Sequence, residues 1–102
     1  MPKAYWIARV DVLDPEGYRA YVAANAAALR RYGGRFLVRG GPFEAVEGES
    51  RARNVVIEFA DHASALACYR SAEYQRAKAL RQGQCVIDLI IIEGYDGPQP
   101  GA

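Results

Sequence analysis

Hydrophobic residues are concentrated in four short segments of the chain, and this pattern predicts four β-strands. The segments cover residues 4–12, 34–39, 54–59 and 85–93. Each segment is rich in β-branched or aromatic residues, which favour strands. The last of them is apolar for most of its length.

A first helix is predicted between the first two strands. Asp14 suits the N-cap, Pro15 suits the first helical position, and Glu16 places an acid in the first turn. One helical face then carries residues at the expected spacing, namely Tyr18, Val22, Asn25, Leu29 and Tyr32. Asn25 is the polar member of this face, and a buried amide needs a hydrogen-bond partner.

A second helical segment follows the third strand. Asp61 caps a helix over residues 62–70, and Ser71 caps its continuation over residues 72–82. Glu73 is favourably placed in the first turn of that continuation, because an acid stabilises a helix N-terminus.

The order strand, helix, strand, strand, helix, strand is that of the ferredoxin-like fold. It predicts a single α+β domain over residues 1–95, with a four-stranded antiparallel sheet and both helical segments on one face. A chain of 102 residues suits one domain. Residues 96–102 contain glycine and proline and little to bury, so we expect a flexible C-terminal tail.

Side chains alternate between the two faces of a strand, so each predicted strand divides into two sets. One set is apolar and is expected to form the core beneath the helices: Trp6, Ala8, Val10, Phe36, Val38, Val55, Ile57, Phe59, Cys85, Ile87, Leu89 and Ile91. The other set is expected to form an open face without helices: Tyr5, Ile7, Arg9, Asp11, Arg35, Leu37, Arg39, Asn54, Val56, Glu58, Val86, Asp88, Ile90 and Ile92.

The predicted open face mixes apolar residues with arginines and carboxylates that balance in charge. Because large apolar patches are seldom left in water, we expect a second copy of the sheet to cover this face. Unpaired ions are costly in a dry core, so the charges are expected to line a partly hydrated cavity between the two sheets. The sequence therefore predicts a homodimer, a dimeric α+β barrel, with a polar cavity inside its interface.

The connection over residues 40–53 joins the second and third strands and is much longer than a hairpin loop. Antiparallel pairing across it predicts that Arg39 lies opposite Asn54 and that Arg35 lies opposite Glu58. Two interpretations remain open for these charges. They form ion pairs that satisfy one another, or Arg39, which has no evident partner, binds an anionic or carbonyl-bearing ligand.

Three motifs resemble those of a known family. They are the stretch from Tyr32 to Gly41, the strand Val56-Ile57-Glu58-Phe59, and the helical segment Tyr69-Arg70-Ser71-Ala72-Glu73-Tyr74-Gln75. On these residues the chain resembles DUF1330, a domain of unknown function in the dimeric α+β barrel superfamily, over residues 4–95. The resemblance implies the fold and the dimer, but no activity. The family pattern has proline where this chain has Ala72, and a bulky aromatic residue where it has Cys68.

A small-molecule site in the cavity between the sheets is the first functional hypothesis. Its catalytic candidates are Glu58 as acid or base, with Tyr69 and Tyr74 as hydroxyl donors at the break between the helices, beside the cavity mouth. Its ligand-binding candidates are Arg39, Asn25, Arg35 and Asn54. The alternative hypothesis is a dimerisation or interaction module without chemistry, in which the tyrosines only pack the core.

Composition narrows the possible partners. Thirteen basic and twelve acidic residues give a net charge of +1, which provides no excess charge for nucleic acid or a membrane surface. The open face of the third strand also lacks the aromatic residues on which RNA-recognition domains stack bases. Two cysteines and one histidine, without a Cys-x-x-Cys pair, predict neither a metal site nor a cofactor. Without a membrane span or a signal peptide, the cytoplasm is the expected location.

Overall fold

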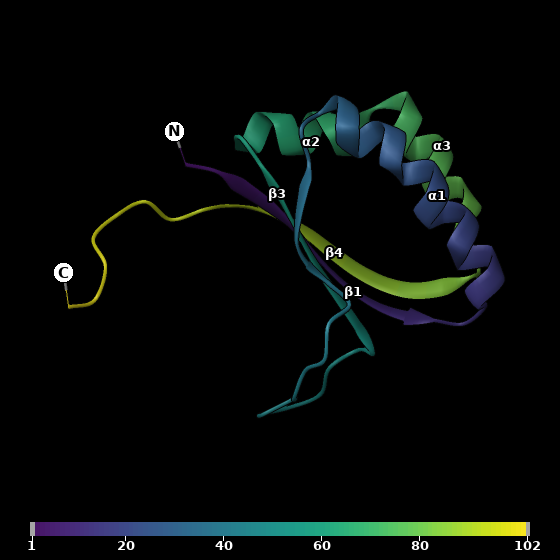
Figure 1. The fold of residues 1–102 in the computed structure, drawn as a ribbon, viewed down its shortest axis with the longest axis horizontal. Helices are drawn as coiled ribbons and strands as arrows, with labels where there is room; N and C mark the ends of the chain where they lie inside the picture. The colour runs from purple at the N-terminus through teal and green to yellow at the C-terminus, as the bar shows by residue number, and fades with distance from the viewer. Residues whose placement is uncertain (1, 102) are drawn as a thin grey trace.

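A computed structural model of the chain describes residues 2–101 (Figure 1). In chain order its elements are β1 (Ala4–Val12), α1 (Pro15–Arg31), β2 (Arg35–Arg39), β3 (Arg53–Phe59), α2 (His62–Arg70), α3 (Ala72–Leu80) and β4 (Cys85–Glu93). The first residue of the predicted domain and the last residue of the predicted tail lie outside the described residues.

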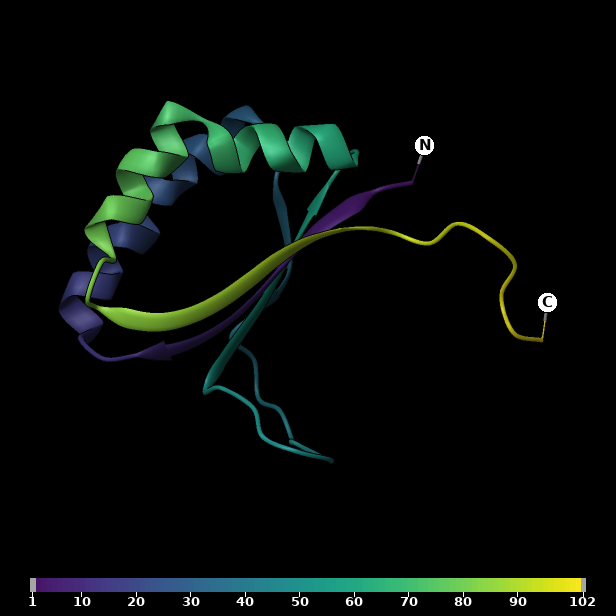
Figure 2. The ribbon, with the colours of Figure 1, turned by 180° about the vertical axis from the view of Figure 1, so that it is seen from behind.

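The four strands form one antiparallel sheet in the order β2-β3-β1-β4. All three helices lie on the same side of this sheet, as Figures 1 and 2 show from opposite directions. This is the predicted ferredoxin-like α+β fold. No helix within the described part of the chain is long and apolar enough to cross a membrane.

Capping side chains explain where the helices begin. Asp14 accepts a hydrogen bond from the backbone N–H of Glu16 at 3.1 Å, which satisfies one free donor of α1. Ser71 both ends α2 and begins α3. Its hydroxyl donates to the Cys68 carbonyl at 2.7 Å and accepts from the Tyr74 N–H at 3.1 Å. Because the backbone of Ser71 is extended, α2 and α3 run in different directions over the sheet (Figure 1).

The core lies between the helices and the sheet and is centred on Trp6. The Trp6 side chain is 2% exposed, and its ring centre lies 4.9 Å from that of Tyr74 and 5.3 Å from that of Phe59. The indole N–H donates to the Ala65 carbonyl of α2 at 3.0 Å. The other residues of β1 and β3 that were assigned to this face are also buried: Ala8, Val10, Val55 and Ile57.

A β-bulge changes the predicted register of the edge strand β2. Arg35 lies opposite Glu58, as predicted, but the pairing shifts between Phe36 and Val38, so that Leu37 is an extra residue. A bulge of this kind moves the side chains that follow it to the opposite faces of the sheet. The alternation that sorted β2 into two faces therefore holds only before Leu37.

The bulge turns Arg39 toward the helix side of the sheet. Arg39 lies opposite the core residue Val55, so the prediction that it lies opposite Asn54 is wrong. Its guanidinium carbon lies 4.1 Å from the centre of the Phe36 ring. The opposite correction applies to Val38. The sequence predicts it in the core, but the structure places it on the open face, where it is 43% exposed.

The connection between β2 and β3 forms an arm, residues 40–52, that has no helix or strand. The arm extends from the sheet on the side away from the helices (Figures 1 and 2). Two apolar side chains near its tip, Phe43 and Val46, are 49% and 84% exposed. The C-terminal residues 94–101 also leave the sheet without regular structure (Figure 1).

Candidate functional site

A cavity lies between α1 and the sheet, on the helix side. Its volume is about 30 Å³, which is room for roughly two water molecules. Apolar side chains from all four strands line it: Trp6, Ala8, Phe36, Val55, Ile57, Ile87 and Leu89. The remaining lining residues come from α1 or carry a positive charge: Tyr18, Tyr21, Val22, Asn25, Arg39 and Arg53.

Asn25 brings a buried amide to this cavity. Helical spacing places it on the same face of α1 as Tyr21, four residues earlier, and Tyr18, seven residues earlier. The residue is 8% exposed, no side-chain hydrogen bond within residues 2–101 involves its amide, and the amide atoms are not among the fully buried unpaired atoms there, so they retain some contact with solvent. An amide offers two N–H donors and one carbonyl acceptor. Because buried polar groups are normally satisfied, this amide is available to a ligand or to water.

Two guanidinium groups give the cavity a positive charge. Arg39 reaches it from the end of β2 because of the bulge, and Arg53 reaches it from the start of β3. The Nε atom of Arg53 is buried and has no hydrogen-bond partner in the described part of the chain. None of the described residues that line the cavity is a carboxylate. The cavity therefore offers donors and positive charge to an anion or a carbonyl oxygen.

Tyr18 and Tyr21 add hydroxyl groups to the wall formed by α1. Burial raises the pKa of Tyr18, and the neighbouring Tyr21 raises it further, so the Tyr18 hydroxyl stays protonated at neutral pH. The Tyr21 oxygen lies 2.7 Å from the hydroxyl oxygen of Tyr74 in α3. Arg81, at the end of α3, donates to the Tyr74 oxygen at 3.4 Å. The cavity wall is thus linked to a hydrogen-bonded cluster beneath the helices.

A larger groove adjoins the cavity on the outside of the molecule. Its volume is about 430 Å³, and its lining residues are Val12, Pro15, Tyr18, Arg19, Val22 and Arg53. Tyr18, Val22 and Arg53 line both the groove and the cavity. The two spaces are therefore neighbours that share these three side chains.

The structure brings together Asn25 and Arg39 but not the other predicted site residues. Arg35, Asn54 and Glu58 belong to the opposite, open face of the sheet. Although Glu58 lies opposite Arg35, the ion pair that it forms within residues 2–101 is with Lys3, at 3.1 Å. The interpretation that Arg35 and Glu58 satisfy one another is therefore wrong.

Tyr69 and Tyr74 lie in the core rather than at a cavity mouth. Tyr74 is fully buried, and burial raises the pKa of its hydroxyl well above the ordinary value. The ring of Tyr69 lies 6.0 Å from that of Trp6, and the Lys78 ammonium lies 5.5 Å from the Tyr69 ring centre. Neither tyrosine lines the cavity. A role for either hydroxyl beside a cavity between two sheets stays a prediction.

Sequence reasoning missed Tyr21 and Arg53 as site residues. Tyr21 lies beside the helical stripe that contains Asn25, and a wider stripe would have included it. The sequence places Arg53 in the connection, whereas the structure makes it the first residue of β3. The cavity described above also lies on the other side of the sheet from the predicted one. A cavity between two sheets needs a second copy of the chain and stays a prediction.

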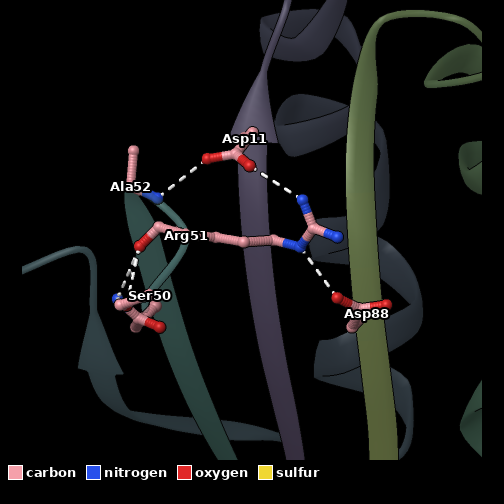
Figure 3. Close-up of polar contacts among 6 residues, drawn as sticks. Asp11, Ser50, Arg51, Ala52 and Asp88 are labelled. Carbon is pink, nitrogen blue, oxygen red and sulfur yellow. Dashed lines mark hydrogen bonds and ion pairs between the residues drawn. The ribbon is translucent and has the colours of Figure 1, made fainter. Parts of the chain in front are cut away.

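Charges on the open face form a separate cluster around Arg51 of the arm. Figure 3 shows Arg51 between Asp11 of β1 and Asp88 of β4, with nitrogen–oxygen distances of 2.8 and 2.7 Å. The Ala52 N–H donates to the other oxygen of Asp11 at 2.9 Å, and Asn54 donates to the Arg51 carbonyl at 3.3 Å. The Ala52 N–H, followed by Arg51, lowers the pKa of Asp11. The cluster fastens the base of the arm to the sheet.

The strand order and the single helical layer define the fold class as ferredoxin-like α+β. The chain belongs to the family described as "Domain of unknown function (DUF1330)", whose model matches residues 3–95. This match confirms the resemblance carried by the three sequence motifs. No curated protein matches the chain.

Several solved structures are similar to this chain in fold. A protein of unknown function from Rhodopseudomonas palustris is 19% identical, with 94% of this chain and 85% of that one covered and a TM-score of 0.76. SnoaB, a cofactor-independent oxygenase from Streptomyces nogalater, is 14% identical, with 98% and 99% covered and a TM-score of 0.63. A protein of the ethyl tert-butyl ether D family from Bacillus halodurans is 16% identical, with 93% and 100% covered and a TM-score of 0.57.

Proposed function

We propose that this protein binds a small carboxylate, or the carboxylate end of a larger molecule, in the cavity between α1 and the sheet. One observation carries the proposal: the buried, unpartnered amide of Asn25 lines the same small space as Arg39 and Arg53, and no carboxylate among the described residues lines it. A ligand carboxylate accepts hydrogen bonds from both kinds of group. Room for roughly two water molecules suits the two oxygen atoms of a carboxylate group.

The groove beside the cavity supports a ligand with a larger body. The groove is lined by the apolar side chains of Val12, Pro15 and Val22. It is also lined by the positively charged side chains of Arg19 and Arg53. A carboxylate in the cavity would leave the apolar remainder of its molecule along this surface. The preferred ligand is therefore a small organic acid whose apolar part follows the groove.

The fold is compatible with such a role. SnoaB is named a cofactor-independent oxygenase, so the same fold serves small-molecule chemistry in that protein. For this chain the proposal is ligand binding without a cofactor, anchored by Asn25, Arg39 and Arg53.

Acetate titration followed by NMR tests the proposal, with the Asn25 side-chain amide signals as the reporter. Replacing Arg39 by alanine should weaken acetate binding roughly tenfold, because a charge-assisted hydrogen bond is lost. Arg35→Ala is the matched control, since Arg35 lies on the same strand but on the open face. Acetate affinity should survive that change. Absence of acetate binding by the native protein, or equal losses in the two variants, would contradict the proposal.

A second function rests on the open face of the sheet. Apolar side chains there are 43 to 54% exposed: Leu37, Val38, Val86, Ile90 and Ile92. We propose that a second copy of the chain covers this face, giving a homodimer whose arms contact the partner. A pure dimerisation module would need only this face. The acetate titration separates the two functions, because such a module would leave the cavity without a ligand.

A further inference from the structure

Arg81 is a buried arginine without a carboxylate partner. It lies at the C-terminus of α3, is 8% exposed, and forms no ion pair within residues 2–101. Its guanidinium carbon lies 5.2 Å from the centre of the Tyr21 ring, and Nη2 donates to the Tyr74 hydroxyl oxygen at 3.4 Å. Buried arginines are normally paired. The contacts of Arg81 with the two tyrosines therefore call for a functional explanation.

The donor inventory and the complete burial of Tyr74 together favour one direction for the hydrogen bond between the two tyrosines. Arginine has only donors, so the Tyr74 oxygen accepts from Arg81. Tyr74 is fully buried, and within the described residues its proton has one acceptor, the Tyr21 oxygen at 2.7 Å. A buried hydroxyl proton without an acceptor is unfavourable. Tyr74 is therefore the donor and Tyr21 the acceptor of this bond.

This direction leaves the Tyr21 proton without an acceptor in the protein. The Tyr21 hydroxyl contacts Tyr74, which already uses its own proton in the shared bond, and it also lies near the Arg81 guanidinium, which has only donors and cannot accept the Tyr21 proton. Tyr21 lines the cavity, one helical turn before the unpartnered amide of Asn25. Its proton is thus available to an oxygen atom that enters the cavity.

We propose that Tyr21 is the hydroxyl group that donates to a ligand oxygen in this cavity, and that Tyr74 and Arg81 are positioning residues that fix the direction of donation. The proposal rests on the proposed function, because it names the group that recognises the carboxylate. The proposal also predicts which ligands the site prefers. Because Tyr21, Arg39 and Arg53 all offer hydrogen-bond donors, the site should favour a ligand group that has only acceptor atoms, such as a carboxylate. Because burial raises the pKa of Tyr74, that residue keeps its proton and the chain keeps its direction across the neutral pH range.

Acetate and acetamide provide the test, because they have the same shape but only acetate carries two acceptor oxygens and a negative charge. The native protein should bind acetate more tightly than acetamide in NMR titrations. Tyr21→Phe should reduce this preference roughly tenfold, which corresponds to one hydrogen bond to a charged group. Tyr74→Phe should reduce the preference for acetate by a smaller factor. In that variant Tyr21 keeps its hydroxyl proton, but no hydrogen bond from Tyr74 directs this proton toward the ligand. Arg81→Lys, which keeps a cationic donor, should retain more of the preference than Arg81→Met.

Tyr69→Phe is the matched control. Tyr69 packs in the same aromatic cluster, but it lies outside the cavity lining. Its replacement should leave the ratio of the two affinities unchanged. A merely structural role for Tyr21 would change both affinities together and leave their ratio intact, which would overturn the inference while the proposed function stands. If neither probe binds the native protein, the proposed function itself fails.

A measurement on the native protein covers the case in which the Tyr21 variant does not fold. The hydroxyl proton of Tyr74 should exchange slowly with water, whereas that of Tyr21 should exchange rapidly and slow down when acetate is added. Slow exchange of both protons, with no effect of acetate on either, would overturn the inference without any substitution.

Discussion

The two faces of the sheet use positive charge in opposite ways. On the open face, Arg51 lies between two carboxylates, and Glu58 pairs with Lys3. On the helix side, Arg39 and Arg53 line a cavity in which none of the described lining residues is a carboxylate. The paired charges of the open face position the arm, while Arg9 and Arg35 on that face form no ion pair within residues 2–101 and stay exposed to solvent. Unpaired donors on the helix side are the ones available to a ligand.

The energetic weight of the two faces also differs. Ion pairs that remain exposed to solvent contribute little to stability, so the Arg51 cluster fixes geometry more than it stabilises the fold. The helix side contains the aromatic core around Trp6, where dispersion and the hydrophobic effect act on fully buried rings. The stability of one chain therefore depends mainly on the helix side.

The largest expected difference between the two faces is in stability, and it can be measured at two neighbouring aromatic residues of β1. Trp6→Ala should lower the free energy of unfolding by about 3–5 kcal/mol, because it leaves a large cavity and removes the indole hydrogen bond to Ala65. Tyr5 lies next in sequence but on the open face, partly exposed. Tyr5→Ala should cost only about 1 kcal/mol. Urea unfolding of the two variants measures both values, and equal losses would contradict the division of roles.

Most of the fold follows from signals that are local in the sequence. The cap at Asp14, the restart at Ser71 and the alternation in β1, β3 and β4 all act over a few residues. These signals predict the elements to within a few residues and give the correct fold class. The DUF1330 motifs agree with them, because the same local pattern carries the resemblance.

The candidate site was harder to predict because it depends on one extra residue. The bulge at Leu37 sends Arg39 to the helix side, and nothing in the alternation of β2 marks that change. Asn25 was found because a polar residue interrupts an apolar helical face. Arg53 and the direction of the Tyr74 hydroxyl depend on contacts between distant segments, which a pattern along the chain does not contain.

A lysine on the open face should change the mass of the protein in solution. Light scattering is expected to give the native protein the mass of two chains and Ile90→Lys the mass of one, because a charge would be buried in the paired sheets. Leu80→Lys is the matched control: Leu80 is 48% exposed, similar to Ile90 at 54%, but it lies on α3 in the helix layer. That variant should keep the native mass. A native protein with the mass of one chain would refute the proposed homodimer.

The smallest expected effect concerns the carboxylate that holds the base of the arm. The pKa of Asp11 is lowered by the Ala52 N–H and by Arg51, so the contact stabilises the fold above the ordinary pKa of aspartate, about 3.9, and is lost as pH falls through the lower folded value. The Ala52 amide signal in NMR spectra should therefore titrate with a midpoint below about 3.9. Asp11→Asn keeps an oxygen that can accept from Ala52 but removes the charge, so this titration should disappear. A midpoint at or above the ordinary value would mean that the arm is not fastened at Asp11 in solution. The paired charges of the open face would then be as available to a partner as the donors on the helix side.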